Sequence, residues 1–233
     1  MAKAAASIFF DIGDSLIHVR DPLHVFYTNV INEVKQTEFP EEAIKTAMED
    51  KLKTMQLRNN GHFRYSDSWF EIYIFSILDS IGCPKPWTPI MKPLFELFTD
   101  PATFLIYPDV VPCLEKVKSS GFTTAVVSNW GYRLPLLLER LNIRPYFDMI
   151  ISSADVELEK PDPRIFELAL SGTKSKANKT VHIGDHVVCD LEGSQAAGIH
   201  GLLLDRKLVH PEREDKIHTL SDLFPYLHKN NVI

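Results

Sequence analysis

The sequence lacks the features that mark several large classes of protein. No apolar run approaches the roughly 18 to 20 residues that a membrane-spanning helix requires. The net charge of −6 leaves no basic excess for neutralising the phosphates of a nucleic acid. No internal repeat or low-complexity segment is present in the sequence. We therefore expect neither a membrane nor a nucleic acid as a partner.

Cysteine is also scarce, and its spacing excludes the usual metal-binding patterns. The three cysteines are Cys83, Cys113 and Cys189, and no pair of them forms a CxxC motif. The first seven residues lead directly into an apolar run and lack the pattern of a secretory signal. An odd number of cysteines without an export signal favours free thiols in a reducing compartment. We therefore expect a cytoplasmic location.

What is present is the composition of an ordinary globular protein, with 45% hydrophobic and 24% charged residues. A length of 233 residues fits one hydrophobic core with an insertion. The segment from Pro22 to about Thr99 shows four helical patterns and no convincing strand. Its predicted helices are 22–35, 40–55, 66–81 and 86–98.

The remainder of the chain alternates short apolar runs with single helices, which is typical of α/β proteins. The candidate strands are 8–10, 104–107, 122–128, 147–152, 180–184 and 201–205. Right-handed crossovers between such strands build a parallel sheet. We therefore predict a doubly wound, Rossmann-like α/β core of residues 1–16 and 102–233, with an inserted helical cap at 17–101. Two hinges would lie near 18–21 and 100–102.

Polar residues follow several of the predicted strands or precede a predicted helix. These residues are Asp11, Ser128, Asn129, Lys160, Asp185 and Asp190. The carboxyl ends of parallel strands share one edge of a sheet, and open α/β sheets bind ligands there. Each residue alone would pass for a turn residue or a helix cap. Together they predict a site at which carboxylates, a hydroxyl and an ammonium converge.

These residues resemble the motifs of the haloacid dehalogenase-like (HAD) hydrolase superfamily, and the resemblance covers nearly the whole chain. The first motif is an Asp nucleophile, usually in Asp-x-Asp-x-Thr, and residues 11–15 read Asp-Ile-Gly-Asp-Ser. The second is a Ser or Thr that ends an apolar strand, here Ser128, and the third is a lysine, here Lys160. The fourth is Gly-Asp with a later Asp, found in residues 184–190. The helical insertion resembles the C1-type cap of this family.

The resemblance implies a Mg²⁺-dependent phosphatase that acts on a small phosphorylated metabolite through an aspartyl-phosphate intermediate. Asp11 would be the nucleophile, and Ser128 and Lys160 would be the other catalytic residues. Mg²⁺ prefers oxygen ligands, which Asp11, Asp185 and the carbonyl of Gly13 would provide. We expect the enzyme to be a monomer or a homodimer.

The resemblance also implies roles for the neighbouring residues. The side chains of Ser128 and Lys160, together with Asn129, would bind the phosphate group. Asp190 would orient Lys160 or a metal-bound water, and Asp14 would lie beside the metal ligands.

One residue departs from the family pattern. Gly13 stands where family phosphatases usually have a second Asp, which protonates the leaving group and later activates water. General acid–base catalysis is typically worth about 10² to 10⁴ in rate, so we expect slow turnover of alkyl phosphates unless Asp14 compensates. Two alternatives therefore stay open. One is a catalytically weakened HAD-fold protein with a binding or regulatory role, and the other is a haloacid dehalogenase.

Overall fold

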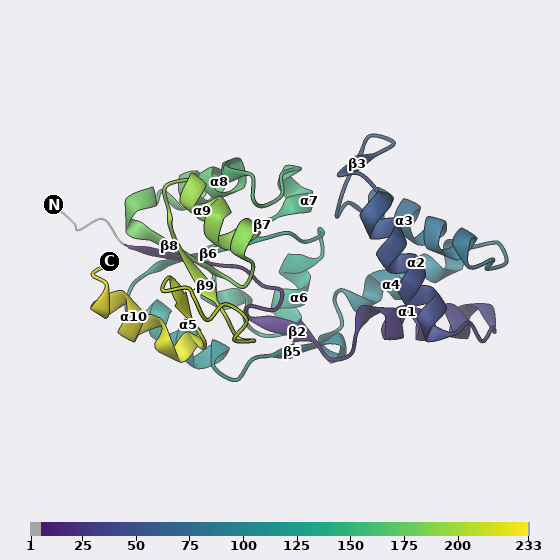
Figure 1. The fold of residues 1–233 in the computed structure, drawn as a ribbon, viewed down its shortest axis with the longest axis horizontal. Coiled ribbons are helices and arrows are strands. Elements are labelled where there is room, and N and C mark those ends of the chain that lie inside the picture. Colours follow the sequence, from purple (N-terminus) through teal and green to yellow (C-terminus); the bar gives the residue numbers. More distant parts are fainter. Residues whose placement is uncertain (1–5, 233) are drawn as a thin grey trace. The chain divides into compact units, whose positions relative to one another are not determined.

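A six-stranded parallel sheet forms the core of one of the two units of the protein in a computed structural model that describes residues 6–232 (Figure 1). The strands are β1 (Ser7–Phe10), β6 (Thr123–Ser128), β7 (Met149–Ser152), β8 (Thr180–Gly184), β9 (His200–Leu204) and β10 (Lys216–Ile217). Their order is β10-β9-β8-β1-β6-β7, and each neighbouring pair is parallel. The chain therefore extends the sheet in both directions from β1, which confirms the predicted doubly wound α/β class.

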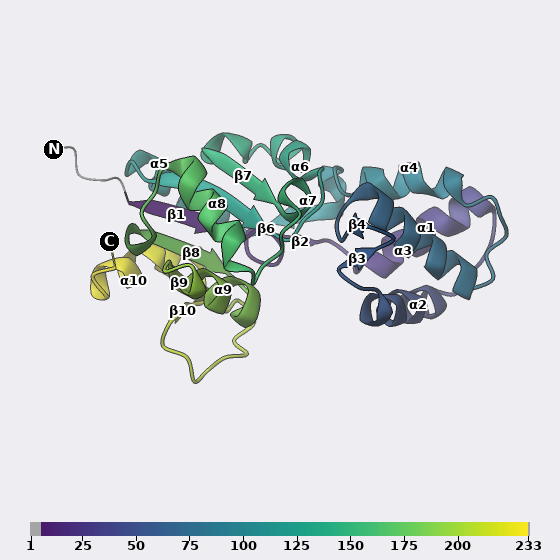
Figure 2. The same cartoon turned by 90° about the horizontal axis from the view of Figure 1, so that it is seen from above.

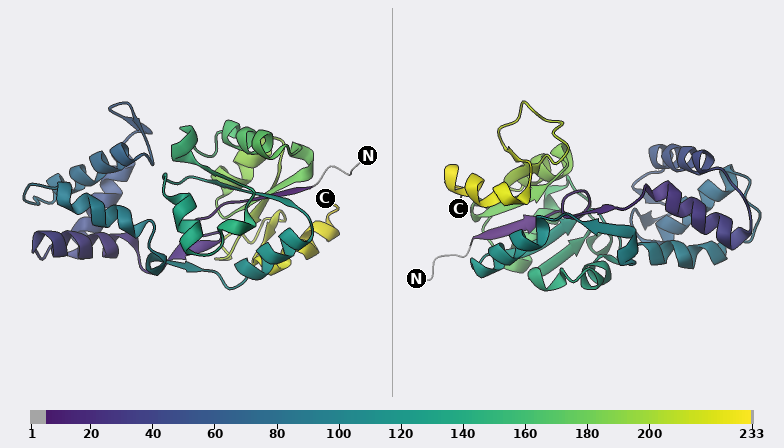
Figure 3. Two further views of the ribbon diagram at one scale, coloured as in Figure 1. Left: turned by 180° about the vertical axis from the view of Figure 1, so that it is seen from behind. Right: turned by 90° about the horizontal axis from the view of Figure 1, so that it is seen from below.

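Helices cover both faces of this sheet. Figures 1 and 3 show α5 (Val110–Ser119) and α10 (Leu223–Lys229) on one face, with α8 (Pro163–Thr173) and α9 (Gly193–Ala196) on the other. All four residues of β1 are buried, as expected for a strand covered on both faces. Successive side chains of a strand point to opposite faces, so Phe9 packs in the cluster that includes residues of α8.

Residue contacts divide the chain into two compact units. The sheet unit contains the described residues up to His18, residues 106–130 and those from Leu141 onward. The helical unit contains Val19–Leu105 and Gly131–Arg140. The second unit thus includes α6 (Leu134–Arg140), which falls within the α/β core domain predicted from the sequence. Long-range polar contacts explain this grouping, since Arg140 donates to the carbonyl of Thr99 at 3.0 Å.

Four further helices build the helical unit (Figure 2). They are α1 (Leu23–Lys35), α2 (Glu41–Thr54), α3 (Asp67–Ser80) and α4 (Thr88–Leu97). Their apolar faces meet in one core that includes Ile44, Trp69, Tyr73 and Leu94. Burial of these faces supplies most of the stability of such amphipathic helices.

The expectation that this segment contains no strand is wrong. β3 (Arg58–Asn59) and β4 (His62–Phe63) form an antiparallel hairpin. Asn60 and Gly61 connect the two strands with φ angles of 49° and 81°. These positive angles are those of a type I′ turn, for which Asn-Gly is the preferred pair.

A second two-stranded sheet, of β2 (Ile17–Val19) and β5 (Phe104–Ile106), lies where the chain passes between the two units. The other short elements are α7 (Ser153–Val156), a π-helix at Val187–Glu192, and 3₁₀ turns at Pro101–Thr103, Arg144–Tyr146, Ala177–Lys179 and Leu220–Asp222. Within the described residues, no helix combines the length and the apolar character that crossing a membrane requires.

Candidate active site

The site forms where three neighbouring strands of the central sheet end. Asp11 follows β1, Ser128 is the last residue of β6, and Asp185 follows β8. β1 lies between β6 and β8, so these residues meet at one edge of the sheet. The backbone N–H of Asp11 donates to the carbonyl of Ile183 in β8 at 2.8 Å and fixes this end of the chain. The topology thus brings together residues that lie more than a hundred positions apart in the sequence.

The carboxylate of Asp11 is the centre of the site. It is 6% exposed, and its Oδ1 accepts hydrogen bonds from Ser128 Oγ at 2.9 Å and from Lys160 Nζ at 2.6 Å. Burial lowers the pKa of the Lys160 ammonium, but the carboxylates of Asp11 and Asp190 raise it by more, so the net shift is upward. Lys160 therefore carries a positive charge against the carboxylate of Asp11.

Asp190 holds Lys160 in this place. Its Oδ1 accepts hydrogen bonds from Lys160 Nζ and contacts His182 Nε2 at 3.0 Å. Its Oδ2 accepts from the backbone N–H of His186 at 3.0 Å. Burial raises the pKa of Asp190, but Lys160 and His182 lower it by more. The net shift is downward, so this carboxyl stays ionised. Both of its oxygens are engaged, which suits the predicted role of orienting Lys160.

Two glycines permit these close approaches. A Cβ atom at Gly184 would lie 2.2 Å from Cγ of Asp190, a distance that only glycine avoids. A Cβ atom at Gly193 would lie 2.9 Å from Cα of Pro161, the residue after Lys160. The packing of the Lys160 loop against the segment after β8 therefore depends on both glycines.

Asn129 fixes the Lys160 loop from the other side. Its Nδ2 donates to the carbonyl of Lys160 at 3.0 Å, and its Oδ1 accepts the backbone N–H of Lys160 at 2.8 Å. Ser153 Oγ donates to the same Oδ1 at 2.8 Å. The side-chain amide thus positions the main chain of Lys160. A contact between Asn129 and phosphate stays a prediction.

Three carboxylates in the site compete for one ammonium. Oxygens of Asp11, Asp185 and Asp190 all lie within 4.8 Å of one another. Burial, followed by the charges of Asp11 and Asp190, raises the pKa of Asp185 to about 7. Asp190 is the most extensively bonded of the three, to Lys160, His182 and the backbone N–H of His186, so Asp11 and Asp185 are better placed to bind a cation. This oxygen donor set fits Mg²⁺, and a contribution from the Gly13 carbonyl stays a prediction.

Gly13 and Asp14, which follow Asp11 in the first motif, have different surroundings. Asp14 has a φ angle of 53°, and its carboxylate forms an ion pair with Lys207 Nζ at 3.0 Å. Its pairing with Lys207 weakens its case as a substitute acid. Gly13 has no positive φ, and a Cβ atom there would meet only the Cζ3 atom of Trp130, at 3.5 Å. Position 13 therefore has room for the Cβ atom that glycine lacks.

Sequence reasoning missed two residues that support the first motif. Ser15 is fully buried, and its Oγ lies 3.4 Å from Asp11 Oδ2 and 3.5 Å from Asp185 Oδ1. Arg206 Nε donates to the Ser15 carbonyl at 3.0 Å, and its guanidinium pairs with both oxygens of Asp109 at 3.0 Å. The position of Ser15 within the motif could have revealed it. Arg206 follows β9 in a loop that carries no local signal.

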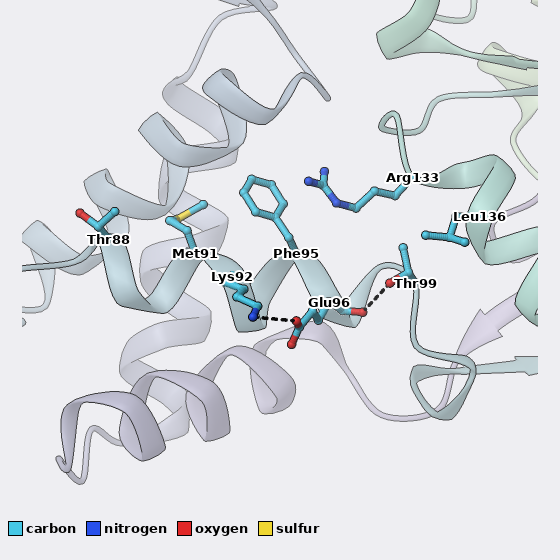
Figure 4. A pocket seen from close by; sticks show the side chains of 8 residues that line it. All are labelled: Thr88, Met91, Lys92, Phe95, Glu96, Thr99, Arg133 and Leu136. Atoms are coloured by element: carbon cyan, nitrogen blue, oxygen red, sulfur yellow. Dashed lines mark hydrogen bonds and ion pairs between the residues drawn. The ribbon is translucent and has the colours of Figure 1, made fainter.

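A separate cavity of about 470 Å³ lies in the helical unit (Figure 4). Side chains of α4 line it together with Thr99, Arg133 and Leu136. The guanidinium of Arg133 lies 4.0 Å from the ring centroid of Phe95 and is paired with Asp67. Arg133 is thus already paired, and we assign the cavity no chemistry.

With the fold and site in place, comparison with known proteins defines the class. Residues 8–203 match the model of the haloacid dehalogenase-like hydrolase family, and the chain belongs to this family. Haloacid dehalogenase-like hydrolase domain-containing protein 3 of Mus musculus is a relative with 31% identity, and the match covers 84% of this chain and 80% of that protein.

Solved structures share the fold. A HAD phosphatase from Thermococcus onnurineus matches with a TM-score of 0.70 and 19% identity, over 95% of this chain and 97% of its own. A 2-haloacid dehalogenase from Pseudomonas syringae pv. Tomato DC3000 matches with a TM-score of 0.72 and 22% identity, over 97% and 99%. A phosphatase and a dehalogenase thus share this fold, so the fold does not decide the reaction and the site must be considered instead.

Proposed function

We propose that the protein is a Mg²⁺-dependent phosphatase that acts on a small phosphorylated metabolite through an aspartyl-phosphate on Asp11. The observation that carries the proposal is the surplus of acidic side chains over basic ones at the site. Asp11 and Asp185 lie within 4.8 Å of each other and of Asp190, while Lys160 supplies one positive charge. Such a cluster favours a divalent cation together with an anionic substrate.

The first step uses the buried carboxylate of Asp11. One of its oxygens forms a bond to phosphorus, and the bond from phosphorus to the leaving-group oxygen breaks. Ser128 and Lys160, which both donate to Asp11, would reach the oxygens of a phosphoryl group bound there. Their donors would stabilise the charge that develops on these oxygens. Bound Mg²⁺, held by Asp11, Asp185 and the Gly13 carbonyl, would supply further positive charge.

The second step hydrolyses the aspartyl-phosphate and regenerates the free enzyme. A water oxygen bonds to phosphorus and the Asp11–phosphorus bond breaks, which releases inorganic phosphate and the free carboxylate. The proton of the water leaves to solvent or to the departing phosphate. With glycine at position 13, neither step has the acid–base assistance that is worth about 10² to 10⁴ in rate. Turnover is therefore slow for leaving groups that need a proton.

The test is hydrolysis of acetyl phosphate, whose leaving group needs little proton assistance. We expect Mg²⁺-dependent release of phosphate, and loss of this activity in Asp11→Asn. Asp79→Asn, an exposed position in the helical unit, is the matched control and should retain the activity. Acetyl phosphate hydrolysis that persists in Asp11→Asn would remove Asp11 from the nucleophile role.

A haloacid dehalogenase is the second candidate, because displacement of a halide needs no proton donor and Gly13 provides none. The cluster of Asp185 with Asp11 weighs against it, since a metal-free reaction has no use for a second carboxylate within 4.8 Å of the first. Release of chloride from 2-chloropropionate without metal would favour this candidate. A phosphoenzyme on Asp11 that forms and does not turn over would instead favour a binding or regulatory role.

A further inference from the structure

The absence of a side chain at Gly13 has a second consequence besides the absence of an acid. It leaves the site open toward the indole ring of Trp130. A Cβ atom at Gly13 would lie 3.5 Å from Cζ3 of this ring. Ser128, two residues before Trp130, donates to Asp11, two residues before Gly13. Two contacts thus join the same pair of chain segments. The Cα atoms of residues two positions apart lie at most about 7 Å from each other, so the ring borders the short loop that follows Asp11.

Trp130 is held in a fixed segment. Its carbonyl accepts a hydrogen bond from the backbone N–H of Ala154 at 3.1 Å. The preceding residue, Asn129, forms the reciprocal pair of hydrogen bonds with the main chain of Lys160. The side chain of Trp130 is half-buried, so part of it remains accessible. Such a fixed aromatic surface beside a reactive group is suited to selecting what binds there.

The chemistry of the leaving group points to the same class of substrate. Without an acid at position 13, the leaving oxygen must depart as a stable anion, and a phenolate is far more stable than an alkoxide. Aromatic rings also gain about 0.5 to 1.5 kcal/mol from contact with another ring beyond their buried area. An aryl leaving group therefore benefits from both features of the Gly13–Trp130 pair.

We propose that Gly13 and Trp130 form a subsite for aromatic leaving groups, and that aryl phosphate monoesters are the preferred substrates. This proposal rests on the proposed phosphatase function. Asp11 forms its bond to phosphorus, the bond from phosphorus to the aryl oxygen breaks, and the electron pair stays on that oxygen. The phenolate then takes a proton from water. Trp130 is a specificity-determining residue in this scheme, since it contacts the group that leaves.

The experiment compares three substrates on the full-length protein with Mg²⁺. They are phenyl phosphate, acetyl phosphate, and a fluorinated alkyl phosphate whose alcohol is about as acidic as phenol. The last compound separates the effect of the ring from the effect of leaving-group acidity. We expect kcat/KM for phenyl phosphate to exceed that for the fluoroalkyl phosphate by about two- to tenfold, the range given by the contact of two rings.

Variants at Trp130 test whether this residue causes the preference for phenyl phosphate. Trp130→Leu should lower the ratio of phenyl phosphate to fluoroalkyl phosphate by about two- to tenfold, and Trp130→Phe should restore most of it. Trp87→Leu is the matched control, because Trp87 is a half-buried tryptophan of the helical unit. A ratio of rates does not depend on the fraction of folded protein, so partial unfolding of a variant leaves the test intact. Phenylphosphonate should also inhibit wild type more strongly than methylphosphonate, and Trp130→Leu should reduce this difference.

The outcomes separate the two proposals. An unchanged ratio in Trp130→Leu, or no preference for the aryl ester in wild type, overturns the subsite and leaves the phosphatase standing if acetyl phosphate is hydrolysed through Asp11. Failure to hydrolyse acetyl phosphate overturns the proposed phosphatase, and the subsite with it.

Discussion

Introducing the missing acid by Gly13→Asp is the most informative change that the site allows. The Cβ atom of the new residue would lie 3.5 Å from the Trp130 ring, which is an ordinary van der Waals contact. The backbone at position 13 has no positive φ that would strain a side chain. The new carboxyl would join the charges of Asp11, Asp14 and Asp185. Like charges raise the pKa of a carboxyl, and a raised pKa keeps it protonated and able to donate.

The magnitude follows from what an acid does for the leaving group. For an alkyl phosphate such as glycerol phosphate, kcat/KM should rise by about 10² to 10⁴ in Gly13→Asp. Acetyl phosphate should gain little, because acetate leaves readily without a proton. Release of inorganic phosphate measures both rates. Gly13→Asn is the matched control, since the amide has nearly the same size and provides no carboxylic proton.

One result would refute the reasoning. If Gly13→Asp gains no more on the alkyl phosphate than Gly13→Asn, while both still hydrolyse acetyl phosphate, then the acid at position 13 does not limit the reaction. A second consequence concerns Trp130, because the Asp side chain would fill the space beside its ring. The preference for phenyl phosphate should therefore shrink in Gly13→Asp.

Further predictions concern stability and the geometry of the site. The unfolded chain ionises Asp185 near the ordinary value of 3.8, whereas the folded, metal-free protein does so near pH 7. The free energy of unfolding of the metal-free protein should therefore fall as the pH rises between these values, and Asp185→Asn or added Mg²⁺ should flatten the curve in urea titrations. Arg206→Lys loses the paired contacts to Asp109 and should cost about 2 kcal/mol in the same assay. Gly184→Ala forces Asp190 to move, because the new Cβ would lie 2.2 Å from its Cγ, and kcat with acetyl phosphate should fall while KM changes less.

The sheet and the convergence of the site residues could be predicted from sequence because both follow from local patterns. A fully buried parallel strand reads as an uninterrupted apolar run, as in Ile8–Phe10. Once the strands are parallel, their carboxyl ends must share one edge, so Asp11, Ser128 and Asp185 meet without any information about their side chains. The topology therefore carries most of the prediction.

The features that the sequence did not reveal depend on contacts between distant residues. The pair of Asp14 with Lys207, 193 positions apart, leaves no trace in the local pattern of either residue. The hairpin at 58–63 is different, because Asn60-Gly61 is a strong turn signal. No strand is predicted there from the sequence, because strands of two residues are too short to show an alternating pattern.

The buried charges of the site argue against a protein that works only through other surfaces. Asp11, Lys160 and Asp190 are almost completely buried, and burial of charge is costly unless each group is paired. A protein that used only other surfaces would need none of these buried charges, whose replacement by apolar residues is often neutral or stabilising. The departure instead falls at Gly13, where the leaving group would lie. We infer that the groups which would attack phosphorus are kept, and that the change concerns which leaving group departs.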